Sequence, residues 1–256
     1  QMTAKASGEI STRYELVDSN GLVPIRLSPK EYVRAHDFRR YLHKNLEDFI
    51  TEIPDEFPLL TLTKKFDEKL ISSSKKKWKP FDFKNSNIDK FLDSLDIDKT
   101  VGISSIEGGY KNASNRFDSF LSEGFSNYAQ FSNDPSKNAS SQMSPYFHFG
   151  HISTHEVFEK LVKHESWSPE QIKTNLVGRR EGWWGGSINF DSFLDELITW
   201  RELGYHTCVR RANYNQYSSL PEWAVKTLQE HANDEREYVY SLDQLTYSET
   251  HDEIWN

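Results

Sequence analysis

The chain has 256 residues, of which 36% are hydrophobic and 14% aromatic, enough to build a core in one large domain or two small ones. No apolar run approaches the ~18 to 20 residues of a membrane span and no signal peptide opens the chain, so we expect a cytosolic or nuclear protein without membrane contact. The formal net charge of −8 argues against a protein coated in positive charge, and the single cysteine, Cys208, excludes internal disulfides and cysteine-ligated clusters.

The N-terminal third is predicted to hold little regular structure. Residues 14–27 combine β-branched side chains with an Asn-Gly turn and a proline, which indicates a short extended segment. Ser28 before Pro29 is typical of an N-cap followed by proline at the first helical position, so we expect a helix from there to about Ile50. Residues 51–85 contain prolines, lysines and serines without periodicity, and we expect a long surface loop.

Lysines are concentrated within that loop, in contrast to an acidic C-terminal stretch over residues 222–253. Either the cluster is a solvated face, or it contacts the phosphates of a nucleic acid along one groove. The lysines concerned are Lys64, Lys65, Lys69, Lys75, Lys76, Lys77 and Lys79.

The rest of the chain is predicted to be helical. Ser153 and Glu156 occupy capping-box positions, as do Ser241 and Gln244, and glycines at 108 and 109 are expected to divide the first long helix. The predicted helices cover residues 104–130, 153–163, a segment opening at 168–169, 189–211, 219–232 and 241–248. No segment after residue 30 alternates like a strand, so we predict an all-α fold with many helices in one domain.

Polar residues interrupt the apolar stripe of the strongest helix. Arg201 lies in line with Leu194 and Leu197, where a guanidinium requires a partner, either in a structural ion pair, for example with Glu202, or in a bound anion. Glu196 and Trp200 are four residues apart and share a face. A carboxylate beside an indole suits a planar ligand such as a nucleobase or a flavin ring, although, taken alone, a core tryptophan and a surface glutamate are the favoured interpretation.

Two further stretches leave alternatives open. The sequence GRREGWWGGS at 178–187 is either the rim of a ligand site or a loop held by buried tryptophans. The stretch SSQMSPYFHFGHIS at 140–153 begins with hydroxyls at Ser140, Ser141 and Ser144, which either cap helices or hold a phosphate. We predict no metal site, because no metal-binding motif includes the histidines, namely His148, His151, His155 and His164.

These motifs together resemble the DNA photolyase and cryptochrome family. The stretch at 140–153, with Tyr128 twelve residues before it, resembles the family's flavin-binding segment. FLDELITWRELGYHTC, YSSLPEWAVKTLQEHANDEREYVYSLDQL and THDEIWN look like successive family blocks, and VDSNGLVP and GGYKNASNRFDSFL extend the match over nearly the whole chain. The resemblance is strongest to the class II cyclobutane pyrimidine dimer photolyases.

The resemblance implies a role for each matching residue. The residues expected to line an FAD site are Tyr128, Ser140, Ser141, Met143, Ser144 and Arg201, with the serines meeting the diphosphate. Glu196 and Trp200 are expected to contact a flipped-out pyrimidine dimer, by a hydrogen bond and by stacking. Met143 replaces the family's leucine, a mild packing change. The position of Arg201 is offset by one residue from other branches of the family.

The resemblance also implies fold, activity and partners. We expect residues 1–28 to link a missing N-terminal α/β antenna domain, with its own possible pigment, to an incomplete helical FAD-binding domain at 29–256. The expected activity is light-driven splitting of pyrimidine dimers in damaged DNA by a flavoprotein deoxyribodipyrimidine photo-lyase, cytoplasmic and nucleoid-associated or nuclear, and monomeric. A cryptochrome-type photoreceptor, a non-enzymatic nucleic-acid-binding module and an inactive fragment are the alternatives.

Overall fold

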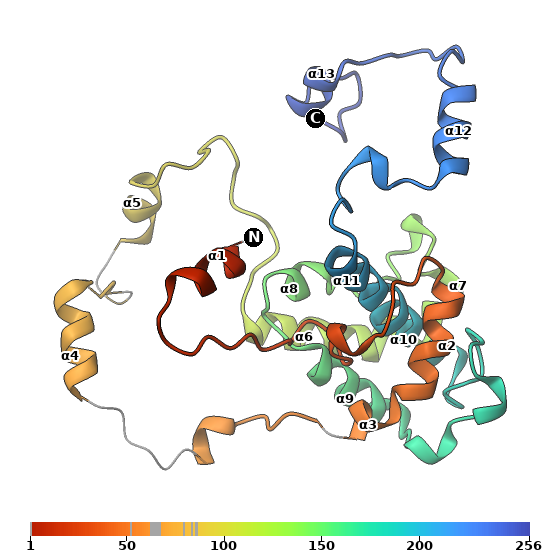
Figure 1. Cartoon of the computed structure of the whole chain (residues 1–256), viewed down its shortest axis with the longest axis horizontal. Coiled ribbons are helices and arrows are strands. Elements are labelled where there is room, and N and C mark those ends of the chain that lie inside the picture. Colours follow the sequence, from red (N-terminus) through yellow and green to blue (C-terminus); the bar gives the residue numbers. More distant parts are fainter. Residues whose placement is uncertain (1, 52, 62–67, 79, 83, 85–86) are drawn as a thin grey trace. The chain divides into compact units, whose positions relative to one another are not determined.

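The computed structural model describes residues 2–51, 53–61, 68–78, 80–82, 84 and 87–256, and all regular elements within these ranges are helical (Figure 1). The prediction of an all-α fold is confirmed, with no strand in the described part of the chain. Two compact units are present, Gln1–Thr207 and Cys208–Asn256. The domain boundaries suggested by the sequence stay predictions.

The helices are mostly short. The α-helices are α1 (Met2–Glu9), α2 (Ala35–Asn45), α3 (Glu47–Thr51), α4 (Glu68–Lys77), α5 (Ile88–Asp93), α6 (Tyr110–Ser119), α7 (Tyr128–Phe131), α8 (Ser144–His148), α9 (Thr154–Glu165), α10 (Ile188–Leu194), α11 (Arg201–Arg210), α12 (Glu222–Glu230) and α13 (Leu242–Thr246). Two π-helical turns, η3 (Phe120–Gly124) and η8 (Asp195–Trp200), continue α6 and α10. The 3-10 turns are η1 (Ile25–Leu27), η2 (Pro58–Thr61), η4 (Phe125–Asn127), η5 (Pro135–Lys137), η6 (Pro169–Gln171), η7 (Thr174–Leu176) and η9 (Tyr217–Ser219).

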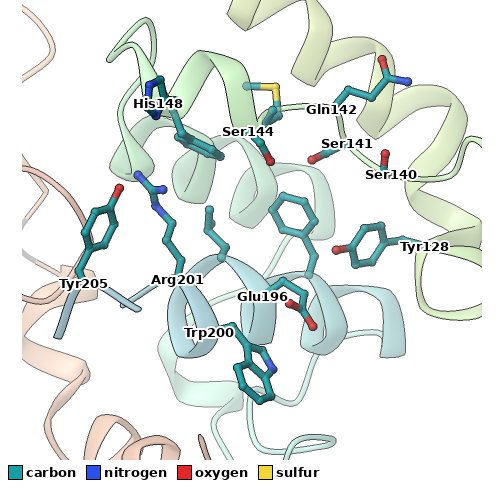
Figure 2. Close-up of a pocket in the computed structure, with 14 residues that line it drawn as sticks. Tyr128, Ser140, Ser141, Gln142, Ser144, His148, Glu196, Trp200, Arg201 and Tyr205 are labelled. Carbon is teal, nitrogen blue, oxygen red and sulfur yellow. The ribbon is translucent and has the colours of Figure 1, made fainter. Parts of the chain in front are cut away.

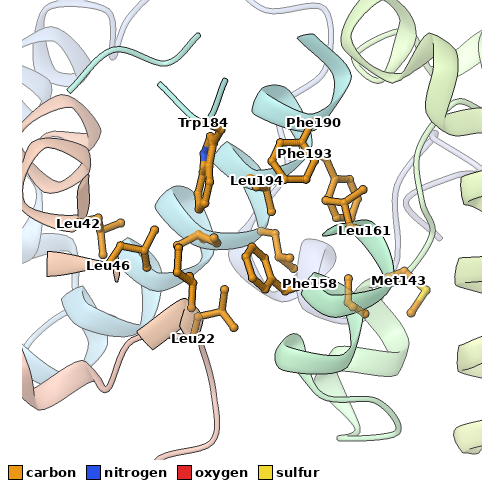
Figure 3. Packing of buried hydrophobic residues seen from close by; sticks show 14 of the residues in the cluster. Leu22, Leu42, Leu46, Met143, Phe158, Leu161, Trp184, Phe190, Phe193 and Leu194 are labelled. Carbon is orange, nitrogen blue, oxygen red and sulfur yellow. The ribbon is translucent and has the colours of Figure 1, made fainter. Parts of the chain in front are cut away.

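The core of the first unit is built around α10 and η8. α10 packs against α7, and α2 packs against η8. Apolar side chains from segments distant in the sequence meet there, as Figure 3 shows for Leu22, Leu42, Leu46, Phe158, Leu161, Trp184, Phe190 and Leu194. Burial of this apolar area stabilises the unit and fixes the helix that carries the predicted site residues.

Side-chain caps begin helices α9, α10 and α13, and the sequence indicated those of α9 and α13. The Ser153 hydroxyl accepts a hydrogen bond from the Glu156 amide at 3.0 Å and opens α9. The Ser187 hydroxyl does the same for the Phe190 amide at 3.1 Å and opens α10. Ser241 forms a full capping box with Gln244 at α13, in the second unit. The predicted starts at 153 and 241 are therefore confirmed.

The predicted helix start at Ser28 is wrong. Helix α2 begins only at Ala35, and its N-cap is Arg34, which makes no side-chain cap. Ser28 is buried, and its hydroxyl donates to the Lys30 carbonyl at 3.0 Å and lies 3.4 Å from Nε2 of His206. The hydroxyl is therefore used in tertiary contacts, so it does not cap the following amides.

Other elements also differ from the predictions. The expected loop over 51–85 contains helix α4, and α1 lies before the segment at 14–27 that was expected to be extended. The helix expected from residue 104 begins at Tyr110, because Gly109 has φ of 98° and breaks the pattern. The helix expected at Ser168 is only the 3-10 turn η6.

The lysine cluster is described only in part. Lys75, Lys76 and Lys77 lie in the last turn of α4, where positive charge is favourable to the helix dipole, and they are exposed. Lys64, Lys65 and Lys79 lie outside the described residues, as does the Lys69 side chain. A phosphate contact by this cluster stays a prediction.

The π-helical turn η8 sets the register of the helix that follows it. The Arg201 amide donates to the Glu196 carbonyl, five residues back, where an α-helix would bond four residues back. A turn of this kind accommodates one more residue than an α-helical turn. It brings Glu196, Trp200 and Arg201 to successive positions along one wall of a cavity.

Candidate flavin and substrate cavity

A cavity of about 640 Å³ lies between the serine segment at 140–144 and the helix formed by η8 and α11 (Figure 2). Its volume is in the range of small-molecule and cofactor sites. The lining residues are Tyr128, Ser140, Ser141, Gln142, Met143, Ser144, Phe147, His148, Phe193, Glu196, Leu197, Trp200, Arg201 and Tyr205. Every site residue predicted from the sequence is in this set, although the roles assigned to them stay predictions.

Hydroxyl groups are concentrated on one wall of the cavity. Ser140 and Ser141 precede α8 and Ser144 begins it, and between them Gln142 adopts a left-handed φ of 57° that turns the chain. The buried Met143 side chain anchors this turn in the core, with 1% of its surface exposed. Within the described part of the chain the three serine hydroxyls form no hydrogen bond, so they are free to bind a polar ligand.

Tyr128 supplies a buried phenol to the same cavity. Its ring packs edge-on to Phe120 and Phe193, with centroids 5.6 and 5.3 Å away. Burial and the Glu196 carboxylate raise the pKa of Tyr128 to about 12, against the opposing charge of Arg180. The phenol therefore keeps its proton at neutral pH and can donate a hydrogen bond.

Glu196 and Trp200 lie side by side along the opposite wall (Figure 2). Desolvation and the neighbouring Asp195 carboxylate raise the pKa of Glu196, while Arg180 and Arg39 lower it. The indole of Trp200 is 49% exposed, so one of its faces is available for stacking. The pair was expected to share a face, and both residues line the cavity.

A buried ion pair between Arg39 and Asp195 stabilises the helix that carries Glu196 and Trp200. Asp195 accepts hydrogen bonds from Nε and Nη2 of Arg39 at 2.7 and 2.9 Å, and both side chains are buried. Arg180 approaches the same carboxylate to 3.6 Å and is half-exposed. Because a bidentate pair has a defined geometry, it holds α2 against η8 and fixes the direction of the residues that follow Asp195.

Arg201 is held by a carbonyl and two rings. Its Nη2 donates to the Asn20 carbonyl at 3.2 Å, and its guanidinium lies 4.7 Å from the Phe147 ring and 4.9 Å from the Tyr205 ring. No ion pair with Glu202 forms, because Glu202 accepts backbone amides instead. Nε of Arg201 is buried and has no acceptor among the described residues, so a donor remains for a group that these residues do not supply.

These features fit an FAD molecule. The cavity offers free hydroxyls, a phenol and an arginine, which suit phosphates and carbonyl oxygens, together with apolar rings from Phe147 and Phe193 for a planar heterocycle.

Comparisons with known proteins bear on the family of the chain. No family model matches the chain. The chain is 31% identical over 245 residues to the deoxyribodipyrimidine photo-lyase of Arabidopsis thaliana, covering 94% of this chain and 44% of that protein. It is 32% identical over 254 residues to the enzyme of Methanothermobacter thermautotrophicus, covering 98% and 48%, and 29% identical over 242 residues to that of Potorous tridactylus, covering 94% and 39%. The chain belongs to the photolyase family.

The chain spans less than half the length of these photolyases. The comparison does not separate the classes of the family, so the class II assignment stays a prediction. The resemblance stated from the motifs is confirmed at the level of the photolyase family as a whole.

The cavity includes residues that the sequence analysis did not assign to the ligand site. Phe147 and His148 lie in the flavin-segment motif itself, and Phe193 and Leu197 belong to the apolar stripe of α10 and η8. Tyr205 is one helical turn after Arg201, and that spacing could have indicated it. The others could not be distinguished from core residues, because their types are those of any core.

The remaining predicted candidates lie elsewhere. Trp183 and Trp184 are buried in the core, which supports the interpretation of residues 178–187 as a loop held by tryptophans. Within the described ranges, no group of three or more His, Cys, Asp or Glu residues is arranged to hold a metal ion. No described helix combines the length and apolar character that crossing a bilayer requires.

Proposed function

We propose that the chain is part of a light-driven DNA photolyase that binds FAD in this cavity and receives a pyrimidine dimer at its mouth. The observation that carries the proposal is the convergence on one cavity of all the residues selected from the sequence for a flavin and for a damaged base. The photo-lyase relatives support this function and do not favour the photoreceptor or the binding module.

The serine wall and Arg201 are proposed to hold the cofactor. The hydroxyls of Ser140, Ser141 and Ser144 would donate to the diphosphate, and the Tyr128 phenol and Arg201 would supply further donors. When bound in its reduced form, the flavin would supply light-driven electron transfer to the dimer. The chain itself binds, orients and shields the two partners from water.

Glu196 and Trp200 are proposed to hold the dimer. Glu196 can hydrogen-bond a base in either protonation state: its protonated O–H would donate to a base carbonyl, whereas the carboxylate would accept from a ring N–H, and desolvation raises its pKa toward the first case. The exposed indole of Trp200 provides a stacking surface that offsets part of the free energy needed to unstack the base.

The test is binding and light-dependent repair of a DNA strand that carries a cyclobutane thymine dimer. Glu196→Ala should weaken dimer binding about tenfold, and Trp200→Ala roughly 5- to 100-fold, since base–aromatic stacking contributes ~1 to 3 kcal/mol. Glu159→Ala and Trp223→Ala, at exposed positions that are not among the lining residues, are the matched controls and should leave binding unchanged. Unchanged dimer binding in both cavity variants would refute the substrate assignment.

A further inference from the structure

Residues 20–23 form a turn that packs directly against the start of α11, next to the cavity. The Leu22 and Val23 amides donate to the same oxygen of Glu202, Oε1, at 2.7 and 3.2 Å. Glu202 is buried, with 3% of its surface exposed. A Cβ at Gly21 would lie 2.6 Å from that oxygen, so the turn approaches Glu202 as closely as a glycine backbone allows.

The same turn supplies the anchor for Arg201. The Asn20 carbonyl accepts from Nη2 of Arg201 at 3.2 Å and from the Thr154 hydroxyl at 3.3 Å. Two successive residues of α11 therefore bind the turn. Glu202 accepts hydrogen bonds from its amides, and Arg201 donates a hydrogen bond to its carbonyl.

Arg201 depends on this carbonyl for its direction. Arg201 has no carboxylate partner among the described residues, and its other neighbours are the rings of Phe147 and Tyr205. Contact with these rings constrains the plane of the guanidinium, but it does not fix the direction of the N–H groups within that plane. A long side chain without a directional hydrogen bond samples several rotamers. The turn therefore decides where the donors of Arg201 point in the cavity.

We propose that Glu202 is a positioning residue for the cavity: by holding the Leu22 and Val23 amides, it fixes the Asn20 carbonyl that orients Arg201 toward a bound anionic ligand. The identity of that ligand, a flavin diphosphate, rests on the proposed function, but the orienting role does not. Burial raises the pKa of Glu202 to about 8, so the group is a neutral acid at neutral pH, and glutamine is its nearest mimic.

The first measurement needs no ligand. In protein labelled with ¹⁵N-arginine, the Nε–H resonance of Arg201, assigned by its loss in Arg201→Lys, should be single and slow to exchange because Nε is buried. Glu202→Gln keeps the accepting oxygen and should preserve this resonance, whereas Glu202→Leu should broaden it and speed its exchange. Glu159→Leu, at an exposed position, is the control. If Glu202→Leu does not fold, Gly21→Ala displaces the same turn and should broaden the resonance in its place.

The second measurement is FAD affinity in a double-mutant cycle. Glu202→Leu should weaken FAD binding roughly tenfold in the wild-type background and have no further effect in an Arg201→Gln background, because its effect passes through Arg201. A purely structural role would weaken binding equally in both backgrounds.

The outcomes separate the two proposals. An unchanged Arg201 resonance in both Glu202→Leu and Gly21→Ala, or equal losses of affinity in both backgrounds, would overturn the positioning role. Absence of FAD binding by the unmodified chain would overturn the flavin assignment and leave the resonance comparison to decide the positioning role by itself.

Discussion

At the scale of single residues, Glu202 and His43 link the stability of the first unit to pH in opposite directions. Glu202 has its pKa raised to about 8 by burial, and His43 has its pKa lowered to about 3 by burial and by the charge of Arg39. His43 stacks on Trp183 at 3.7 Å and accepts a hydrogen bond from the Gly178 amide, an arrangement that requires the neutral ring. Each group titrates differently once the chain unfolds.

For Glu202 we expect stability to fall as pH rises. Between the ordinary pKa of 4.5 and about 8, the unfolded chain has lost the Glu202 proton while the folded chain keeps it, so stability decreases by at most about 1.4 kcal/mol per pH unit. Urea denaturation of wild type and Glu202→Gln between pH 6.5 and 8 should show a flatter dependence in the variant. If the free energy of unfolding depends on pH equally in the two proteins, the assignment of this pH dependence to Glu202 is wrong.

For His43 we expect the reverse sign at lower pH. Between the ordinary pKa of 6.5 and about 3, the unfolded chain binds a proton that the folded chain does not, so stability falls as pH decreases. His43→Asn, which can still accept from the Gly178 amide, should remove this part of the acid sensitivity. The test compares the denaturation midpoints of His43→Asn and wild type from pH 6.5 to 4. An equal loss of stability in both proteins would contradict the role assigned to His43.

At the scale of elements, the N-caps of α9 and α10 differ in the number of contacts that they make. Ser153 caps only its own helix, whereas the Ser187 hydroxyl both accepts from the Phe190 amide and donates to Glu165 at 3.0 Å, which joins α10 to the end of α9. A helix start that also serves as a tertiary contact loses more when it is removed.

We therefore predict that Ser187→Ala is more destabilising than Ser153→Ala. Loss of a cap alone costs roughly 0.5 to 2 kcal/mol, and Ser187→Ala should exceed Ser153→Ala by about 1 kcal/mol because Glu165 also loses a partner. Urea midpoints of the two single variants, with Ser153→Thr as a control that keeps a capping hydroxyl, measure the difference. Equal losses would show that the Glu165 contact adds nothing.

At the scale of the whole molecule, residues far apart in the sequence define the cavity wall. Arg39 and Asp195 are 156 positions apart and form a buried bidentate pair that joins α2 to the π-helical turn η8. The turn of residues 20–23 reaches α11 across a separation of about 180 positions. The cavity is thus a property of the assembled unit.

Removing one member of the buried pair should be strongly destabilising. Arg39→Met leaves the buried Asp195 carboxylate with only Arg180 at 3.6 Å, and we expect a loss of about 3 to 5 kcal/mol. The double variant Arg39→Met with Asp195→Leu should recover part of this loss, because it removes the unpaired charge as well. Denaturation of the single and double variants tests this coupling, and strict additivity would argue against it.

The sequence by itself determined the helical class, the caps at Ser153 and Ser241, and part of the set of residues that line the cavity. These depend on local periodicity, on side chains that bond to nearby amides, and on motifs whose order along the chain is preserved. The tertiary structure alone decided that Ser28 bonds to Lys30 and lies against His206 instead of capping a helix, and that a π-helical turn brings Glu196, Trp200 and Arg201 to one wall. It also decided that Glu202 accepts from the Leu22 and Val23 amides instead of pairing with Arg201. A polar side chain takes the partner that leaves the fewest buried groups unpaired, and that choice depends on which distant segments the core brings together.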